Sequence, residues 1–190
     1  MIKNTIKIAL VGQPNVGKSM LINSISNARL KVGNFSGVTV SKEQVFFDYK
    51  NFHIEIVDLP GAYSLNDYTI EEKVTKDFLN NEKYDIILNV LDSTNLQRNL
   101  LLTAELLTLD KKMIIALNMS DEAEKESILI DEIQLSKILG KPCIKTSAAK
   151  KIGVTKLLDE IIFKFKSEKV PNKRYFSSAI EEEKIGRAHV

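Results

Sequence analysis

An octapeptide near the N-terminus, GQPNVGKS at residues 12–19, constrains the fold more than any other stretch. It matches the pattern G-x-x-x-x-G-K-[ST]. The mostly apolar residues 5–11 before it predict a buried strand, and residues 19–27 after it predict a helix of about two turns. Glycine at Gly12 and Gly17 lets backbone N–H groups turn inward toward phosphate oxygens, beside the positive end of the helix. The chain is therefore expected to hold phosphate at its first strand-to-helix connection.

The composition is that of an ordinary globular domain with a tail. The chain has 190 residues, of which 44% are hydrophobic and 27% are charged, and its formal net charge is +2. Charges of both signs are interspersed, so we expect no nucleic-acid partner. The single cysteine, Cys143, cannot form an intrachain disulfide, and no apolar run approaches the ~18 residues of a membrane span. These features predict a cytosolic domain.

Beyond the octapeptide, runs that predict strands alternate with runs that predict helices. Residues 42–49 and 53–58 predict two strands whose short connection, Lys50–Asn51, permits only an antiparallel pair. The later alternation of strands and helices is typical of a parallel sheet covered on both faces. We predict an α/β fold with a mostly parallel six-stranded sheet, one antiparallel edge strand and helices on both faces. The other predicted strands are 5–11, 84–91, 112–117 and 142–145, the other predicted helices are 69–80, 96–109, 131–139 and 154–165, and loops are predicted at 28–40 and 59–68.

Two side chains of the octapeptide and a later tetrapeptide form the expected phosphate end of the site. Lys18 would place a point charge at the outer phosphates, and the Ser19 hydroxyl would bind Mg²⁺. The tetrapeptide DLPG, residues 58–61, ends a strand at the same edge of the sheet. Asp58 can reach the magnesium ion through water, and the Gly61 N–H can sense the γ-phosphate of a nucleoside triphosphate.

Two later strand ends predict recognition of guanine. NMSD, residues 118–121, follows the strand at 112–117, and its carboxylate, Asp121, can accept hydrogen bonds from both N1–H and the exocyclic amine of guanine. Adenine has no donor at either position, so a carboxylate left unpaired would reject it. TSA, residues 146–148, follows the next strand, where a backbone N–H can meet the guanine O6. Four matches in this order, at strand ends where open α/β sheets bind ligands, predict a site for GTP and GDP.

The motifs resemble those of translation-factor-like GTPases with a GxPNVGKS loop. More narrowly, they resemble the N-terminal G domain of the FeoB family of bacterial ferrous-iron transporters. The marks of this resemblance are VGQPNVGKS, KVGNFSGVTV, DLPGAYSL, LNVLDSTNLQRNL and LNMSDEAE, within residues 5–167. Bacterial ribosome-assembly GTPases share the first loop, but they usually carry Thr-Thr-Arg in the first switch, D-T-P-G or D-T-A-G in the second and N-K-x-D for the base. The chain has GVTV, DLPG and NMSD instead, which favours the transporter family.

The resemblance implies a Ras-like P-loop GTPase fold within a modular protein. Residues 1–167 would form the GTP-binding domain, and residues 168–184 would start a helical domain that acts on nucleotide release. The final residues 185–190, IGRAHV, resemble a translated sequencing-adapter read, and we interpret them as a candidate non-native tail. A membrane domain would follow, which implies a cytoplasmic domain of a protein in the bacterial inner membrane. The expected partners are these further domains, small cytosolic iron-transport proteins and other copies of the chain in an oligomer.

The resemblance also implies a slow reaction that is assisted by a cation. Ala62 occupies the position after D-x-x-G where Ras-like enzymes place a water-orienting glutamine, so intrinsic GTP hydrolysis should be slow. In potassium-activated relatives, an asparagine at the position of Asn15 coordinates K⁺, which would supply the charge of an arginine finger. The alternative is that Asn15 only stabilises the loop turn. Residues 30–41 and 59–70 would be the two switches, and Thr39 in the first would bind Mg²⁺ in the GTP state.

The predicted function is a slow GTPase switch of a ferrous-iron uptake transporter, with Mg²⁺ as cofactor and K⁺ as activator. The alternatives are a free cytosolic ribosome-assembly GTPase and a GTP-binding regulatory module whose turnover is incidental. The residues expected to act in hydrolysis are Asn15, Lys18, Thr39 and Gly61, and the expected metal ligands are Ser19, Thr39 and Asp58 for Mg²⁺ and Asn15 for K⁺. The full predicted nucleotide-binding set is Gly12, Gln13, Pro14, Asn15, Val16, Gly17, Lys18, Ser19, Met20, Gly37, Val38, Thr39, Asp58, Leu59, Pro60, Gly61, Asn118, Met119, Asp121, Thr146, Ser147 and Ala148.

Overall fold

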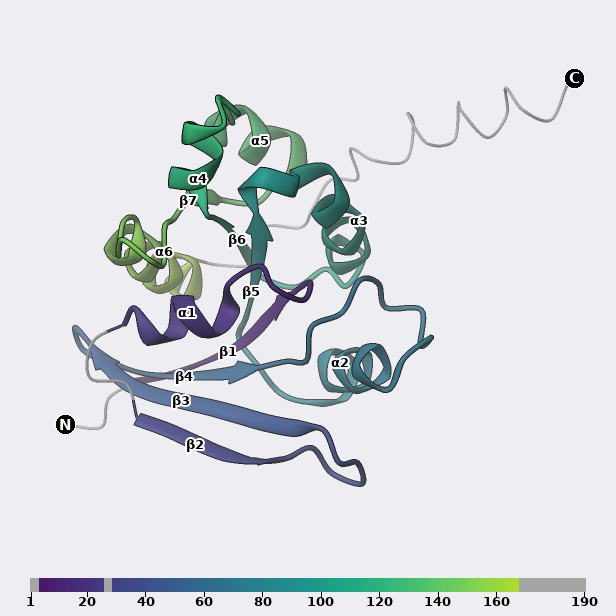
Figure 1. The fold of residues 1–190 in the computed structure, drawn as a ribbon. Coiled ribbons are helices and arrows are strands. Elements are labelled where there is room, and N and C mark those ends of the chain that lie inside the picture. The colour runs from purple at the N-terminus through teal and green to yellow at the C-terminus, as the bar shows by residue number, and fades with distance from the viewer. Residues whose placement is uncertain (1–3, 26–28, 168–190) are drawn as a thin grey trace, which may run out of the picture.

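The computed structural model of the chain describes residues 4–25 and 29–167. Within them the chain forms one mixed β-sheet with helices packed on both of its faces (Figure 1). The predicted start of a helical domain, residues 168–184, and the candidate tail, residues 185–190, lie outside this range. Among the described residues, no helix combines the length and the apolar character that a membrane crossing requires.

The sheet has seven strands in the spatial order β2-β3-β4-β1-β5-β6-β7. β1 is central and runs parallel to both of its neighbours, β4 and β5, and β6 and β7 continue this parallel half. β3 is antiparallel to both β2 and β4. The strands are β1 (Asn4–Gly12), β2 (Arg29–Asn34), β3 (Ser41–Tyr49), β4 (Phe52–Asp58), β5 (Ile86–Asp92), β6 (Met113–Asn118) and β7 (Cys143–Lys145).

Strand β2 is the main departure from the sequence prediction, because residues 28–40 were expected to form a loop. The sheet therefore has seven strands instead of six, and the antiparallel strand β3 lies one position in from the edge. All six residues of β2 are exposed, including Leu30 and Val32 at 60% each. A strand that is held through its backbone needs no alternation of buried and exposed side chains, which explains why the sequence pattern did not reveal it.

Helices cover both faces of the sheet, which confirms the predicted α/β architecture (Figure 1). On one face, Ile6, Ile8 and Leu10 of β1 pack in a core with α1 and α6. On the other face, Ala9 and Val11 of the same strand pack in a core with α2 and α3. The short helix α4 was not predicted. The helices are α1 (Lys18–Asn23), α2 (Ile70–Asn81), α3 (Leu96–Leu107), α4 (Ser120–Lys125), α5 (Glu132–Leu139) and α6 (Val154–Lys166), and a 3₁₀ turn (Ser93–Asn95) precedes α3.

Helix α5 covers the edge of the sheet at β7. The backbone N–H of Cys143 donates to the Ser136 hydroxyl at 2.8 Å, and the N–H of Lys145 donates to the Glu132 carboxylate at 3.0 Å. The two acceptors are four positions apart on α5, so they lie on one face of that helix. Two side chains of a helix thus satisfy backbone donors of the terminal strand.

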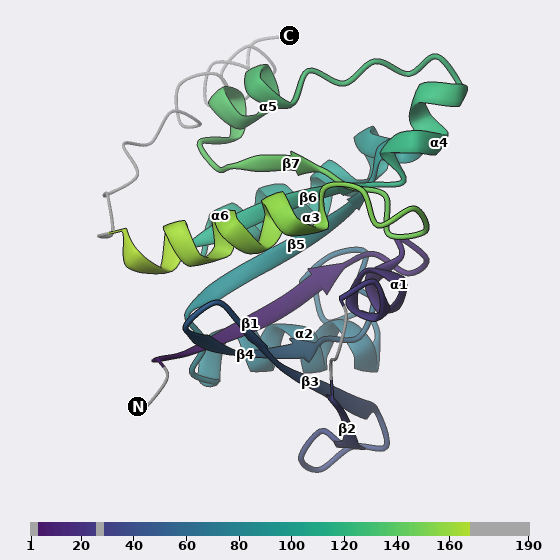
Figure 2. The ribbon, with the colours of Figure 1, turned by 90° about the vertical axis from the view of Figure 1, so that its left-hand side faces the viewer.

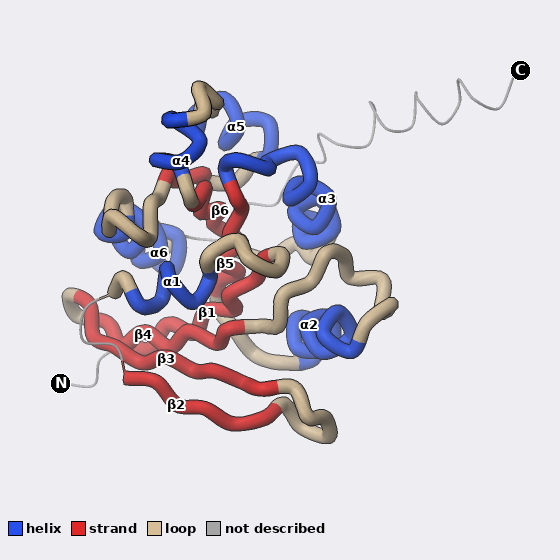
Figure 3. Tube along the Cα trace, in the orientation of Figure 1, coloured by secondary structure: helices blue, strands red, loops and turns tan. Residues whose placement is uncertain are grey.

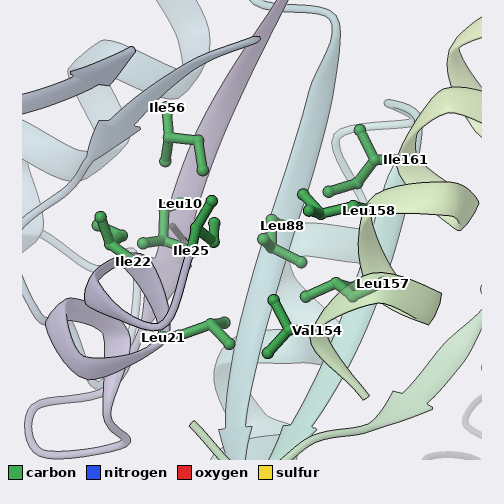
Figure 4. Close-up of a pocket in the computed structure, with 10 residues that line it drawn as sticks. All are labelled: Leu10, Leu21, Ile22, Ile25, Ile56, Leu88, Val154, Leu157, Leu158 and Ile161. Atoms are coloured by element: carbon green, nitrogen blue, oxygen red, sulfur yellow. The ribbon is translucent and has the colours of Figure 1, made fainter. Parts of the chain in front are cut away.

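A small apolar cavity lies between α1, α6 and the sheet (Figure 4). Its volume is about 10 Å³, which is room for about one water, and its lining offers that water no polar side chain. We attribute the cavity to imperfect packing between the two helices and assign it no ligand. The lining residues are Leu10, Leu21, Ile22, Ile25, Ile56, Leu88, Val154, Leu157, Leu158 and Ile161.

Candidate nucleotide-binding site

The predicted motifs come together at the edge of the sheet where the parallel strands end. The octapeptide follows β1, DLPG begins at the last residue of β4, Asn118 is the last residue of β6, and residues 146–148 follow β7. Figure 3 shows the connecting loops in tan, and Figure 2 shows from the side that the loop after β1 approaches the loop between β7 and α6. This edge is where open α/β sheets bind ligands.

The two glycines of the octapeptide are required by its geometry. Gly17 has φ 85°, a left-handed conformation that glycine adopts readily, and it precedes the first residue of α1. A Cβ atom on Gly12 would lie 2.6 Å from the carbonyl oxygen of Val90 on the neighbouring strand. Asn15 has φ 66° and an exposed side chain at the tip of the loop. These backbone angles and close approaches are compatible with the phosphate-binding prediction.

Asn118 connects the octapeptide to the loop after β7. Its side-chain amide donates to the carbonyl oxygen of Val16 at 2.9 Å. Its side-chain oxygen accepts from the N–H of Ala148 at 3.1 Å and from the Thr146 hydroxyl at 3.3 Å. The residue is 1% exposed, so these bonds are shielded from water. Asn118 is thus placed to hold the predicted phosphate loop and the predicted base loop in a fixed relation.

Asp121 lies in the first turn of α4, which begins after Met119 in a left-handed conformation with φ 57°. The Lys150 ammonium is 3.1 Å from the Asp121 carboxylate, whose side chain is only 11% exposed. A hydrogen bond from Ser147, together with Lys150, holds the pKa of Asp121 below its ordinary value. The carboxylate is therefore ionised at neutral pH and available as a hydrogen-bond acceptor. Lys150 was not among the predicted residues, and it lies two positions beyond the TSA motif.

A cleft of about 210 Å³ lies at the other end of the site, and we call it the Lys18 cleft. It brings together four residues that were predicted to act at the phosphates: Lys18, Ser19, Asp58 and Gly61. It also contains Ser41 and Glu43 of β3, which were not among the predicted residues. The complete lining is Lys18, Ser19, Ser41, Glu43, Asp58, Leu59, Pro60 and Gly61.

The charged groups of the Lys18 cleft perturb one another. Burial raises the pKa of Asp58 to about 6, an effect that the Lys18 ammonium opposes and the Glu43 carboxylate reinforces. Burial also lowers the pKa of Lys18, and Asp58 opposes that shift. One carboxylate oxygen of Asp58 is buried without a hydrogen-bond partner among the described residues. A polar oxygen in that situation is suited to a cation or an ordered water.

The structure does not bring Thr39 into the Lys18 cleft. Thr39 is exposed in the turn between β2 and β3, which also contains the exposed Gly37 and the half-buried Val38. The N–H of Phe35 donates to the carbonyl oxygen of Val40 at 3.0 Å and closes this turn. Thr39 is therefore separate from the other predicted Mg²⁺ ligands in this arrangement, and its binding of Mg²⁺ in the GTP state stays a prediction. Binding through Thr39 would require the turn to move toward the cleft.

The loop after DLPG is held in place by contacts with the octapeptide and by two carboxylates. A Cβ atom on Gly61 would lie 2.9 Å from the backbone nitrogen of Pro14, so only glycine permits this approach. The Glu72 carboxylate of α2 accepts from the N–H groups of Ser64 at 3.1 Å and Tyr68 at 3.2 Å. The Glu105 carboxylate of α3 accepts from the N–H of Leu65 at 2.6 Å. In the sequence, Glu72 could be noticed from its position three residues after Thr69, a spacing typical of a helix start. No comparable pattern marks Glu105.

The stretch LNVLDSTNLQRNL also contacts the octapeptide. The buried side chain of Gln13 donates from its amide to the carbonyl oxygen of Arg98 at 2.8 Å. The Arg98 guanidinium lies 4.7 Å from the centroid of the Tyr63 ring, in the loop after DLPG. The start of α3 therefore connects the predicted phosphate loop to the predicted second switch. Gln13 was predicted from the sequence and Arg98 was not, because their contact is formed only in the folded chain.

Comparison with known protein families agrees with the family resemblance that the sequence motifs indicated. The chain matches the family model described as "Ferrous iron transport protein B" over residues 6–161. It is 62% identical over 160 residues to an Fe(2+) transporter FeoB of Helicobacter pylori. The match covers 83% of this chain and 25% of that protein. An Fe(2+) transporter FeoB of Campylobacter jejuni is matched over 29% of its length. The chain thus spans between a quarter and a third of the length of these two relatives.

A solved structure of a similar protein has the same fold as this chain. The cytosolic domain of the T. maritima FeoB iron transporter, in its GMPPNP form, is 36% identical to the chain and superposes with a TM-score of 0.86. The match covers 94% of this chain and 71% of that one. GMPPNP is an analogue of GTP, so that protein binds a guanine nucleotide on the fold described above.

Proposed function

The chain belongs to the FeoB family of ferrous iron transport proteins, and from this premise we propose that its described residues bind guanine nucleotides and hydrolyse GTP to GDP and phosphate. The observation that carries the proposal is the position of Asn118. Its hydrogen bonds hold the glycine-rich loop and the loop beside Asp121 together, which suits a ligand with phosphates at one end and guanine at the other. Calorimetry of the chain with GTP, GDP and ATP tests it, and we expect heat of binding from the two guanine nucleotides alone.

The residues of the Lys18 cleft are also suited to Mg²⁺. The Ser19 hydroxyl and the Asp58 carboxylate are oxygen donors of the kind that magnesium prefers, and one Asp58 oxygen has no partner among the described residues. When held there by Ser19 and Asp58, Mg²⁺ would supply positive charge that offsets the negative charge of the outer phosphates. Lys18 would hold the same phosphates, and the loop N–H groups would orient them. Thr39 would join this set only after its turn moved.

We expect the intrinsic rate of hydrolysis to be low. Ala62 is 1% exposed, and its backbone N–H donates to the carbonyl oxygen of Gly12 at 3.3 Å. Its methyl side chain can neither orient nor polarise a water molecule at the γ-phosphate. The same feature would suit a regulatory module in which nucleotide occupancy is the signal and turnover is incidental.

Potassium is expected to raise the rate of hydrolysis by about 10- to 100-fold over sodium at matched ionic strength. The proposed site is beside Asn15, an exposed residue of the octapeptide with a side-chain oxygen that could bind a cation. A monovalent cation there would offset negative charge that develops on the phosphoryl group. Sodium is smaller and fits a carbonyl-lined site less well. Phosphate release in KCl and in NaCl is the measurement.

The matched variant for the potassium experiment is Asn15→Ala. It should lose the activation while retaining GTP binding, because the loop N–H groups and Lys18 are unchanged. Equal rates of the unaltered chain in the two salts would contradict the cation mechanism. The regulatory-module interpretation would then be the better one.

Replacing Met119 with lysine is expected to slow GDP dissociation by about 2- to 10-fold. A Cβ atom on Gly17 would lie 3.6 Å from the methyl carbon of Met119, so this side chain already reaches the octapeptide. It offers apolar contact but no ammonium to hold the loop. Stopped-flow release of a fluorescent GDP analogue measures the effect, with Ile133→Lys on exposed α5 as the control for added charge. An unchanged rate in Met119→Lys would show that an ammonium at this position does not help to hold the octapeptide around GDP.

The role of the domain in iron uptake is proposed from the family alone. We propose that it acts as the cytoplasmic switch of a ferrous-iron transporter in the bacterial cell membrane, followed by helical and membrane domains. Small cytosolic iron-transport proteins and further copies of the chain are the proposed partners. Family membership favours this role over that of a free ribosome-assembly GTPase.

A further inference from the structure

Glu43 is the one charged residue of the Lys18 cleft to which neither the motifs nor the proposed reaction assigns a role. It lies on β3 directly opposite Asp58 on β4, in the antiparallel pairing of these strands. Directly opposite residues of an antiparallel pair have Cβ atoms about 4.5–5.5 Å apart and project from the same face. Two carboxylates are therefore neighbours at the position where the outer phosphates are expected.

The charge balance of this cleft is unfavourable for phosphate on its own. Glu43 and Asp58 carry negative charge, and among the described residues Lys18 is the only cation in the lining. Like charges placed directly opposite one another destabilise a strand pair. The influence of Glu43 on Asp58 is consistent with this proximity, since it raises the pKa of that carboxyl. A nucleotide would bring several further negative charges, whereas a divalent cation would bring two positive ones.

We propose that Glu43 makes guanine-nucleotide binding conditional on a divalent cation, because its carboxylate repels bare phosphates and attracts the cation that the phosphates carry. The inference rests on the proposed function and extends it to a residue outside the recognised motifs. Both electrostatic effects raise the factor by which a divalent cation strengthens nucleotide binding. Removing the Glu43 charge should strengthen nucleotide binding without metal and weaken it with metal. The ratio of the two affinities is therefore more sensitive than either affinity alone.

The test measures the Kd of a fluorescent GDP analogue in excess MgCl₂ and in excess EDTA, at matched ionic strength. The three proteins are the unaltered chain, Glu43→Gln and Asp48→Asn. Asp48 lies on the same strand and pairs with His53 at 2.9 Å, outside the cleft, so its variant loses the same charge elsewhere. We expect the ratio of Kd in EDTA to Kd in magnesium to fall about 5- to 20-fold in Glu43→Gln. It should change less than twofold in Asp48→Asn.

A second measurement uses the reciprocity of linked binding. The factor by which magnesium strengthens nucleotide binding must equal the factor by which nucleotide strengthens magnesium binding. Titration of the free and GDP-bound protein with Mn²⁺, followed by electron paramagnetic resonance, should therefore show the same loss of coupling in Glu43→Gln. Glu43→Thr, which keeps a residue favoured in strands, repeats the test if the glutamine variant does not fold.

Three results would overturn the inference. The first is a ratio in both Glu43 variants within twofold of that of the unaltered chain. The second is an equal fall in Asp48→Asn, which would indicate a general effect of net charge. The third is an absence of GDP binding by the unaltered chain in both conditions, which would overturn the proposed function as well. Tight binding with an unchanged ratio would remove the role of Glu43 alone.

Discussion

Replacing Lys18 with alanine is expected to weaken GTP binding by about 3 kcal/mol or more, which is a loss of at least about 100-fold. In the part of the chain that the structure describes, Lys18 is the only cation lining its cleft, and burial already lowers its pKa. Without it, the phosphates of GTP would face Asp58 and Glu43 with no opposing side-chain charge in that described lining. The loss of GTP affinity should exceed that caused by removing a surface lysine. In the cleft, few water molecules are available to take the place of the lost ammonium beside the phosphates. Isothermal titration calorimetry with magnesium-GTP measures the difference.

The control for this variant is Lys31→Ala, which removes the same charge from the exposed strand β2. GTP affinity should remain within about twofold of the original value, because exposed charges at a distance are screened. Normal binding of GTP by Lys18→Ala would show that the octapeptide does not hold the phosphates. The placement of the nucleotide along this edge of the sheet would then be wrong.

Replacing Asp121 should change which base the site accepts. In Asp121→Ala the acceptor for two guanine donors is lost, and we expect guanine-nucleotide binding to weaken by about 2–4 kcal/mol. In Asp121→Asn an amide donor can face the base in place of one carboxylate oxygen, which suits the carbonyl of xanthine. XTP should therefore displace GTP from the asparagine variant, whereas GTP should be preferred by the unaltered chain. Competition against a fluorescent GDP analogue gives both affinities.

Glu122→Gln is the matched control for the base, because residue 122 is the next on α4 and its side chain is exposed. It should leave the preference for GTP unchanged. Equal affinities of the unaltered chain for ATP and GTP would contradict the assignment of Asp121. The same conclusion would follow if Asp121→Asn retained its full preference for GTP over XTP.

Much of the fold could be predicted because burial and backbone geometry constrain it. Strand β1 is apolar on both faces, and a side chain at Gly12 or Gly17 would approach its neighbours too closely. Strand β2 could not be found this way, because its residues are exposed and it is held by pairing with β3. Helix α4 is also short and has only Ser120 and Ala123 buried, so it leaves a weak periodic signal.

The site was predictable where function depends on short contiguous motifs. Lys18, Ser19, Asp58 and Gly61 do line one cleft. Residues that act through the folded arrangement were missed, as with Glu43, which faces Asp58 only once β3 and β4 have paired. Thr39 illustrates the converse limit, since its motif indicates a role in the GTP state while the hairpin holds it elsewhere.

The two edges of the sheet differ in how readily they could take part in aggregation. At β7, the side chains of Ser136 and Glu132 occupy backbone donors that a foreign strand would need. At β2, all six residues are exposed and no described strand pairs beyond it, so this edge is the one where another chain could add a strand. Fibril-like growth at high concentration would therefore be directional, starting from β2 and unable to continue from β7 without first displacing α5.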